Sequence, residues 1–334
     1  MAQKNSGGRK KARAWLLSAI FDLCLTGAVL CVFALFHHVL PQLRLGAEGV
    51  PAPVATVAAG GGAEYNKENG DAALTWREKF AEHFSASVIS GESSYSSPDV
   101  SVTVTKHSST EAYPALTYYV ADIYIAQIEN FRTSFADGQT ADAPETIAGQ
   151  NAAVVAINGD YCTNQTEGFL VRNGQVYLTE QTTADICVLY YDGRMETYAP
   201  DEYLVDEVLG DRPYQVWKFG PELLESDGSA KSVFNTSDVL TGLHPRSGIG
   251  YFEPGHYCFV IADGRQSGYS DGVDMRGFAE IFASLGCVSA YNLDGGASAV
   301  MVYGGRTVNA PSSGGRYVSD MLLIRETDGA EAEK

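Results

Sequence analysis

A carboxylate, two glycines and a hydroxyl lie within one short segment near the C-terminal end of the chain, Asn292-Leu293-Asp294-Gly295-Gly296-Ala297-Ser298. Apolar residues 287–291 precede this segment and apolar residues 299–303 follow it, which is typical of a turn between two buried strands. Paired glycines permit positive φ and a close approach of the backbone to a ligand. Asp294 is therefore a candidate acid, base or nucleophile, with Gly295, Gly296 and Ser298 beside the substrate. The alternative is a tight hairpin whose aspartate only caps its own turn.

Two further apolar runs also end in a polar residue followed by glycine. Residues 151–157 lead into Asn158-Gly159-Asp160, and residues 257–262 lead into Asp263-Gly264-Arg265. Polar groups on loops that a rigid sheet positions are the usual makeup of a site. Asp160 is the second candidate catalytic carboxylate, since paired carboxylates serve as acid, base or nucleophile at a sugar carbon. Asn158, Asp263 and Arg265 are candidate binding residues, and their alternative role is to satisfy loop backbone groups.

Arg246, Asn309 and Arg316 lie in loops that contain glycine or proline and complete the candidate binding residues. A pair of arginines offers planar guanidinium groups that suit a phosphate or a carboxylate. Taken singly, each arginine is equally well explained as the partner of a surface ion pair. We expect the candidate residues to converge in one cleft if they form a site.

The elements that must position these residues are mostly strands. Residues 100–105 alternate between valine and a hydroxyl residue, with the period of two of a half-buried strand. Asn-Gly at 173–174 and Asp-Gly at 192–193 are hairpin turn signals. Residues 273–285 have apolar side chains near helical spacing and end at Gly286, a predicted C-cap, and residues 74–84 predict a short helix. We therefore predict an α+β fold, with a largely antiparallel mixed sheet, a few helices and a single domain.

Composition limits the class of protein and the kind of partner. With 334 residues and 45% hydrophobic residues, the chain can bury a sizeable core. The formal net charge of −18 argues against nucleic acid as a partner, because no basic face balances it.

The N-terminal part has the pattern of a membrane anchor. Residues 1–14 contain a basic cluster without acids, and an apolar stretch with a single charge, Asp22, follows. Its length matches a membrane-spanning helix and exceeds the apolar core of most cleavable signal peptides, which are the alternative. Basic residues that flank a membrane helix usually lie on its cytoplasmic side, which places the N-terminal tail in the cytoplasm and the rest of the chain outside. We predict a cytoplasmic tail at 1–14, a transmembrane signal anchor at 15–38, a linker at 39–75 and an extracytoplasmic domain at 76–328.

The sequence contains no motif that specifies a cofactor. No Cys-x-x-Cys pair, histidine ligand spacing or Asp-x-Asp-x-Asp-Gly loop is present, so we predict no metal, with a divalent cation such as calcium left open. Four cysteines, Cys162, Cys187, Cys258 and Cys287, lie in the predicted extracytoplasmic domain, where disulfides are permitted. Buried thiols and disulfide bridges are equally compatible with their apolar surroundings.

Seven segments in a fixed order resemble the phosphodiester glycosidase family. They are residues 131–136 (FRTSFA), 157–161 (INGDY), 245–250 (PRSGIG), 263–270 (DGRQSGYS), 292–298 (NLDGGAS), 308–311 (VNAP) and 316–320 (RYVSD). The resemblance covers about 100–325, and its bacterial members share the membrane-anchored layout and an association with exopolysaccharide. It implies hydrolysis of a sugar-1-phosphodiester, such as an N-acetylglucosamine-1-phosphodiester, in surface glycans or their precursors.

The resemblance also implies a role for each candidate residue. Asp294 would act at the sugar carbon, and Arg246 and Arg316 would bind the phosphate. The remaining candidates would line the sugar and phosphate subsites: Asn158, Asp160, Asp263, Arg265, Ser298 and Asn309.

Two positions depart from the family pattern. Members usually carry a glutamate where this chain has Gly277, and alanine occupies positions 297 and 299 around Ser298. If the glutamate is catalytic in the family, this chain is instead a non-catalytic module that binds glycan or phosphate during envelope or exopolysaccharide assembly. Hydrolysis of another kind of phosphodiester is a third reading.

Overall fold

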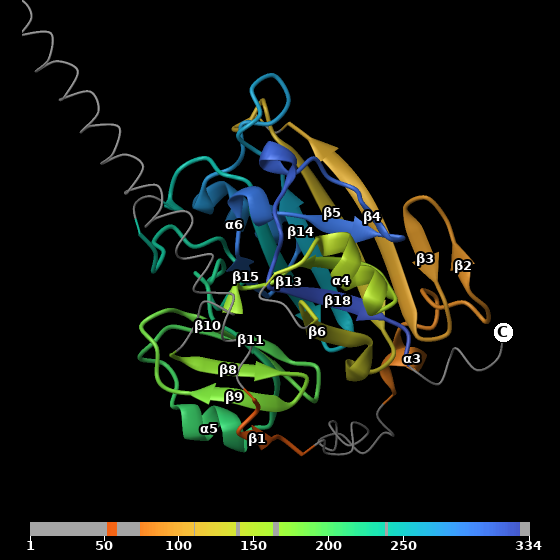
Figure 1. Cartoon of the computed structure of the whole chain (residues 1–334), viewed down its shortest axis with the longest axis vertical. Helices are drawn as coiled ribbons and strands as arrows, with labels where there is room; N and C mark the ends of the chain where they lie inside the picture. The colour runs from red at the N-terminus through yellow and green to blue at the C-terminus, as the bar shows by residue number, and fades with distance from the viewer. Residues whose placement is uncertain are drawn as a thin grey trace, which may run out of the picture. The chain divides into compact units, whose positions relative to one another are not determined.

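A computed structural model describes residues 52–58, 74–109, 111–137, 141–162, 167–237 and 240–327. The predicted tail at 1–14 and the predicted transmembrane segment at 15–38 lie outside these residues. Within the described ranges, no helix has both the length and the apolar character that crossing a bilayer requires. The described residues fall in one compact unit, residues 50–334 (Figure 1).

The described strands form three sheets, and every strand pairing among them is antiparallel. The antiparallel character predicted from the sequence is therefore confirmed, whereas the prediction of one mixed sheet is wrong. Sequence periodicity identifies strands but carries little information on which strands pair, so the division into sheets could not be predicted.

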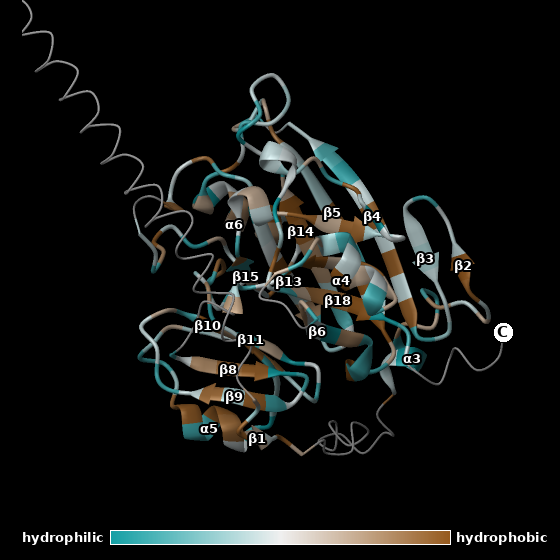
Figure 2. Cartoon of the chain, viewed as in Figure 1, coloured by the Kyte–Doolittle hydropathy of each residue, from teal (hydrophilic) through white to brown (hydrophobic). Residues whose placement is uncertain are grey.

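The seven-stranded sheet has the order β15-β13-β14-β5-β4-β3-β2. Its strands are β2 (Ile89–Ser90), β3 (Ser94–Ser96), β4 (Val100–Ser108), β5 (Thr117–Ile125), β13 (Arg246–Glu253), β14 (His256–Ala262) and β15 (Ser289–Leu293). Figure 2 shows hydrophobic and hydrophilic residues alternating along β4, where Val100 and Val102 are fully buried. The period of two in the sequence thus marks the core-facing side of this strand.

The five-stranded sheet has the order β17-β16-β7-β18-β6. Its strands are β6 (Phe131–Phe135), β7 (Ala153–Asn158), β16 (Met301–Tyr303), β17 (Arg306–Thr307) and β18 (Asp320–Arg325). Helix α4 (Pro144–Gln150) packs on this sheet through Ile147 and Ala148.

The six-stranded sheet has the order β1-β9-β8-β12-β10-β11. Its strands are β1 (Ala55–Thr56), β8 (Phe169–Arg172), β9 (Gln175–Thr179), β10 (Ile186–Tyr190), β11 (Met195–Tyr198) and β12 (Pro213–Trp217), and α5 (Val205–Gly210) lies beside them (Figure 1). The Asn-Gly hairpin is confirmed, with positive φ at Asn173 and Gly174. Residues 52–58 were predicted to be linker, but Ala55 and Thr56 pair with β9. Strand β1 is defined by its pairing with β9, and its two residues are too few to show a periodic pattern in the sequence.

Two further helices test the predictions of helical structure. Helix α6 (Met275–Leu285) begins after the N-cap Asp274, ends at Gly286 with φ +87°, and covers β14 and β15 with Phe278, Ile281 and Phe282. Helix α3 (Trp76–Lys79) is shorter than the helix predicted at 74–84. Short 3-10 turns occupy η2 (Ile128–Asn130), η5 (Gly296–Ser298) and η6 (Ser312–Gly314).

One aromatic cluster joins the three sheets. Phe131 on β6 packs against Trp217 on β12, with ring centroids 5.8 Å apart, and against Phe259 on β14 at 5.6 Å. All three side chains are fully buried. Because each comes from a different sheet, the contacts of Phe131 hold the sheets around one core.

We expect Phe131→Ala to lower the free energy of unfolding by about 3–5 kcal/mol, because it leaves a cavity where the sheets meet. Chemical denaturation measures this change. Val233→Ala is the control, since that side chain is 80% exposed, and its effect should stay within about 0.5 kcal/mol. Equal effects of the two substitutions would contradict this role of Phe131.

Candidate functional site

Strand register brings the candidate loops to one edge of the seven-stranded sheet. Arg246, the first residue of β13, pairs with Ala262 at the end of β14. On the other side of β13, Ser247 pairs with Leu293 at the end of β15. The segments that follow Ala262 and Leu293 carry Arg265 and Asp294, so antiparallel pairing alone places these residues near Arg246.

A cleft of about 260 Å³ lies at this edge. Six of the predicted site residues line it: Arg246, Arg265, Asp294, Gly295, Gly296 and Arg316. The cleft is also lined by Phe219, Leu240, His244, Pro245, Asn292, Leu293 and Ala297. The expected convergence of Asp294, Arg246 and Arg316 is therefore present, while their chemical roles stay predictions.

Arg316 holds the carboxylate of Asp294. Its Nη2 donates to Asp294 Oδ2 at 2.6 Å, and its Nε donates to the hydroxyl of Ser298. The guanidinium lies over the ring of Tyr161, 5.5 Å from the centroid. The Asp294 side chain is only 15% exposed, against 47% for Arg316. Asp294 is thus a shielded, oriented carboxylate whose partner remains accessible from solvent.

Arg246 is a buried cation held by neutral groups. Its Nε donates to the carbonyl of Val273 at 3.2 Å, and its Nη2 donates to those of Leu240 and Gly242 at 2.5 and 2.8 Å. No carboxylate in the described part of the chain forms an ion pair with it. Burial lowers the pKa of Arg246 to about 10, against the opposing charge of Asp274. A buried positive charge of this kind favours a bound anion.

Arg265 reaches the cleft from a strained backbone position. Its φ is +58°, and its Nη2 lies 3.1 Å from Nδ1 of His244. Gly296, with φ +64°, makes room for this side chain, because a Cβ there would lie 3.0 Å from Arg265 Nη1. Non-glycine residues with positive φ are uncommon and concentrate at functional sites.

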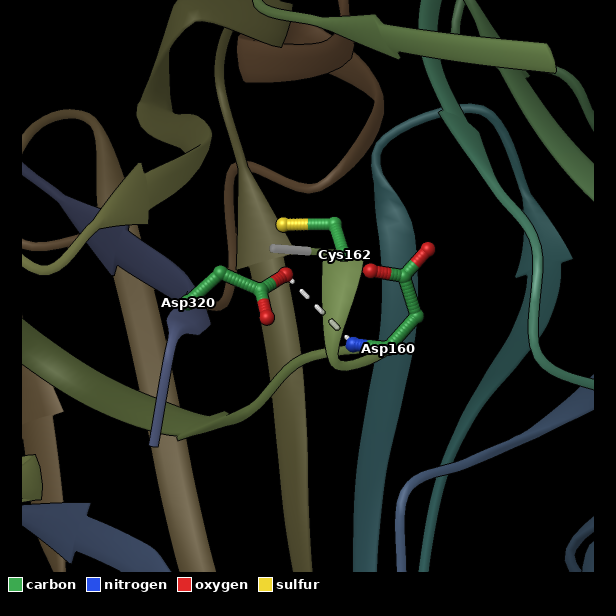
Figure 3. Close-up of side chains that lie close together, drawn as sticks. All are labelled: Asp160, Cys162 and Asp320. Carbon is green, nitrogen blue, oxygen red and sulfur yellow. Dashed lines mark hydrogen bonds between the residues drawn. The ribbon is translucent and has the colours of Figure 1, made fainter. Parts of the chain in front are cut away.

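Asp160, the second predicted catalytic carboxylate, does not line the cleft. Its carboxylate is fully buried, 2.6 Å from Nη2 of Arg172, and it accepts the backbone N–H of Lys218 at 2.8 Å. Asp320 shares this pocket, and its Oδ2 accepts the backbone N–H of Asp160 at 3.4 Å (Figure 3). This placement favours a positioning role for Asp160 over the predicted catalytic one.

Asn158 positions the Asp294 turn from beneath. Its Nδ2 donates to the carbonyl of Asp294 at 2.5 Å, and its Oδ1 accepts the N–H of Val300 at 3.2 Å. The N–H of Asp294 in turn donates to the carbonyl of Gly159 at 3.2 Å. Asn158 is buried and is not part of the cleft lining, so it acts through the backbone that carries Asp294.

Asp263, which is buried, and Asn309, which is half-buried, form a pair behind the cleft. Asn309 Nδ2 donates to Asp263 Oδ1 at 2.8 Å, and the hydroxyl of Tyr269 donates to Oδ2 at 2.8 Å. Burial raises the pKa of Asp263, while the bond from Asn309 opposes the shift. This pair connects the loop after β14 to the loop after β17, and neither residue lines the cleft.

One group of three possible metal ligands occurs among the residues that the structure describes. Oxygen and sulfur atoms of Asp160, Cys162 and Asp320 lie within 4.8 Å of one another (Figure 3). The guanidinium of Arg172 already pairs with Asp160 and lies 3.7 Å from Asp320. A thiol is also a poor ligand for calcium, which prefers oxygen. These residues therefore fit an ion-pair cluster better than a calcium site.

Tyr113 fills the space beside Gly277, the position at which the family resemblance leads us to expect a glutamate. A Cβ on Gly277 would lie 2.3 Å from the Tyr113 hydroxyl. That hydroxyl donates to Asp274 Oδ1, the N-cap of α6, at 2.7 Å. A larger side chain at 277 would require Tyr113 to move.

The residues that sequence reasoning missed include two side chains that line the cleft and one buried ion-pair partner. His244 and Phe219 line the cleft, and Arg172 forms the buried ion pair with Asp160. His244 directly precedes the Pro-Arg segment that carries Arg246, so its position was a usable signal. Arg172 directly precedes the Asn-Gly hairpin turn, and the sequence offers no local sign of its distant partners.

Replacing Gly296 with alanine should weaken anion binding in the cleft. The new Cβ would displace Arg265, and loss of one charge-assisted contact corresponds to about a tenfold rise in the Kd for inorganic phosphate, measured by calorimetry. Gly304→Ala is the matched control, because Gly304 also has a positive φ, +57°, with open space around it. Both variants should lose about 1–2 kcal/mol of stability. Unchanged affinity in Gly296→Ala would contradict this role.

The buried carboxyl of Asp320 should make stability depend on pH. Burial and the adjacent Asp160 raise its pKa from 3.8 to about 7. Unfolding then releases a proton between these pH values, so this contribution to stability is full below pH 4 and falls as pH rises to 7. Asp320→Asn should flatten the profile of unfolding free energy between about pH 4 and 7. The exposed Asp227→Asn variant should keep the wild-type slope, and parallel profiles for all three proteins would refute the assignment.

Comparison with known proteins places the chain in a family. Residues 151–325 match the phosphodiester glycosidase family. An uncharacterised protein of Bacillus subtilis strain 168, the SPbeta prophage-derived YomE, is 30% identical over 190 residues, which is 55% of this chain and 29% of that protein. The chain thus spans less than a third of that relative.

Two solved structures share the fold. The catalytic domain of zebrafish N-acetylglucosamine-1-phosphodiester α-N-acetylglucosaminidase, auto-inhibited by its pro-peptide, has a TM-score of 0.57 and 18% identity, over 69% of this chain and 85% of that one. A hypothetical protein from Synechocystis has a TM-score of 0.53 and 14% identity, over 69% and 63%. The family match covers more than half of the residues, and the chain belongs to the phosphodiester glycosidase family.

Proposed function

We propose that this protein is a glycosidase that hydrolyses sugar-1-phosphodiester linkages, such as that of an N-acetylglucosamine-1-phosphodiester, in surface glycans or their precursors. The observation that carries the proposal is a shielded carboxylate, Asp294, in a cleft that three arginines line. A carboxylate can act at the sugar carbon, and the arginines can hold the phosphate beside it.

The phosphate sits between Arg246 and Arg316 in this proposal. Arg246 supplies a charge that is already fixed by carbonyl groups, and Arg316 supplies a second one that also orients Asp294. Donors that are fixed before the reaction stabilise the charge that develops on the leaving group. Arg265 adds a third donor group at the rim, held beside His244.

A single carboxylate in the cleft is consistent with this reaction. Asp294 is the one acidic residue among the described residues that line the cleft. A phosphate monoester is a good leaving group, so cleavage of the sugar–oxygen bond needs charge stabilisation more than a general acid. Asp294 then either activates water or attacks the anomeric carbon itself.

The cellular setting is part of the same proposal. A basic N-terminal tail and an apolar stretch at 15–38 support a single-pass anchor in the cell membrane with the domain outside the cytoplasm. The substrate is then a glycan or sugar phosphate at the cell surface, in keeping with a role in exopolysaccharide metabolism.

A non-catalytic glycan- or phosphate-binding module is the second candidate. It is favoured by Tyr113, which occupies the space next to Gly277 where the family usually has a glutamate. In that case the arginines would bind the phosphorylated glycan without turnover.

Asp294→Asn should lower kcat/KM for release of N-acetylglucosamine from its 1-phosphodiester by about 10²–10⁴-fold. In isotopically labelled water, the label should enter the sugar and leave the phosphate unlabelled. Binding of inorganic phosphate should be retained, because the arginines remain.

Asp227→Asn, a replacement of an exposed aspartate outside the cleft, is the control and should keep wild-type turnover. Equal turnover by Asp294→Asn would remove Asp294 from the mechanism. Label in the phosphate would identify another kind of phosphodiesterase, and binding without turnover in the wild type would favour the binding module.

A further inference from the structure

Two cysteines face each other in the core between the seven-stranded sheet and α6, and neither lines the candidate cleft. Cys258 lies on β14, and Cys287 lies in the turn between Gly286, the C-cap of α6, and β15. Their sulfur atoms are 3.6 Å apart, and both side chains are buried. They are free thiols in this structure.

Gly250 creates the space in which the two sulfurs meet. It lies on β13, pairs with Cys258 on one side, and pairs with Ala290 of β15 on the other. A Cβ at position 250 would lie 2.7 Å from each sulfur atom. The absence of a side chain on the intervening strand therefore lets Cys258 reach across β13 toward Cys287.

The two sulfurs are already in van der Waals contact, 3.6 Å apart. A disulfide has an S–S length of about 2.05 Å, so rotation of the two side chains must bring the sulfurs closer by roughly 1.5 Å. We propose that Cys258 and Cys287 are joined by a disulfide when the domain folds in an oxidising compartment. Such a compartment is where the predicted signal anchor would deliver it.

The bond would form by exchange with the disulfide of an extracytoplasmic protein oxidase. One cysteine thiolate attacks a sulfur of the oxidase, forming a mixed disulfide and releasing one oxidase thiolate. The second cysteine thiolate attacks the mixed disulfide at the first cysteine's sulfur, and the oxidase leaves as a dithiol. The two electrons and two protons of the protein thiols are thereby transferred to the oxidase.

The timing of this exchange follows from burial. Burial raises the pKa of the Cys258 thiol well above its usual value, and its bond with Cys287 adds to the shift. Only the thiolate is reactive, so the folded domain protects the pair from exchange. We therefore expect the bond to form before β13, β14 and β15 close over it, and to resist mild reductants afterwards.

The bond would close a segment that carries part of the candidate cleft. The cysteines are 29 positions apart, and the enclosed chain includes Arg265 and all of α6. Cross-linking such a loop restricts the unfolded chain and stabilises the folded one. The other two described cysteines, Cys162 and Cys187, are buried and contact no cysteine sulfur within the described ranges, so they serve as internal controls.

A peptide map tests the proposal directly. The full chain is produced with its N-terminal segment in a bacterium that has an extracytoplasmic disulfide oxidase, and free thiols are alkylated in denaturant before trypsin digestion. Cleavage at arginine gives residues 247–265 and 277–306, each with one cysteine. We expect these two peptides to be found linked, two hydrogens lighter than their sum, and separated by dithiothreitol.

Thermal unfolding gives a second readout. Reduction in denaturant followed by refolding with blocked oxidation should lower the thermal midpoint by about 5 °C or more. The double variant Cys258→Ala/Cys287→Ala should have the same thermal midpoint with and without reduction. The thermal midpoint of Cys187→Ala should still fall on reduction. Four alkylated thiols at 162, 187, 258 and 287 in the exported wild-type protein, or a bond to Cys162 or Cys187, would overturn the proposal.

Discussion

The contact between the six-stranded and the five-stranded sheet beside the cleft depends on one buried guanidinium. Arg172, at the end of β8, donates to Asp160 after β7 and to the carbonyl of Val216 on β12, and lies close to Asp320 at the start of β18. Its side chain has no exposed surface. Burying a charge is costly unless it is paired, so removal of one partner would leave an uncompensated ion in the core. The end of β8 is therefore held to the ends of β7 and β18, which places the six-stranded sheet against the five-stranded one.

Two residues, Asn158 and Gly159, connect this ion pair to the cleft. Asp160 follows Asn158, whose side chain donates to the carbonyl of Asp294, and Gly159, whose carbonyl accepts the N–H of Asp294. The predicted site residues thus separate into two kinds. Asp294 and the arginines face the cleft, whereas Asn158, Asp160, Asp263 and Asn309 fix the loops that carry them. Polar residues in glycine-containing loops serve both to bind a ligand and to fix the loop. Residue type alone therefore does not show which of the two roles a residue has.

Local patterns in the sequence predicted local structure well. The alternation in β4, the Asn173-Gly174 hairpin and the end of α6 at Gly286 depend only on neighbouring residues, and all three are present. Local patterns were insufficient where a partner distant in sequence decides the placement of a residue. Residues 55–56 pair as a strand with β9, and Asp160 lies in a buried ion pair with Arg172 and outside the cleft lining. The cleft residues were already candidates because they follow apolar runs or lie in loops with glycine or proline, and the family resemblance added an expected role for each.

The two arginines of the predicted phosphate site differ in what an arriving anion must disturb. Arg316 already has an anionic partner, so a ligand there competes with the carboxylate of Asp294. Arg246 is held by the carbonyl oxygens of Val273, Leu240 and Gly242, which orient its charge without neutralising it. An anion can approach Arg246 without breaking an ion pair, so this half of the cleft has a small reorganisation energy. On one side of the cleft, the charge of Arg246 is available to an anion at once. On the other side, the charge of Arg316 becomes available only when an anion replaces Asp294 as its partner.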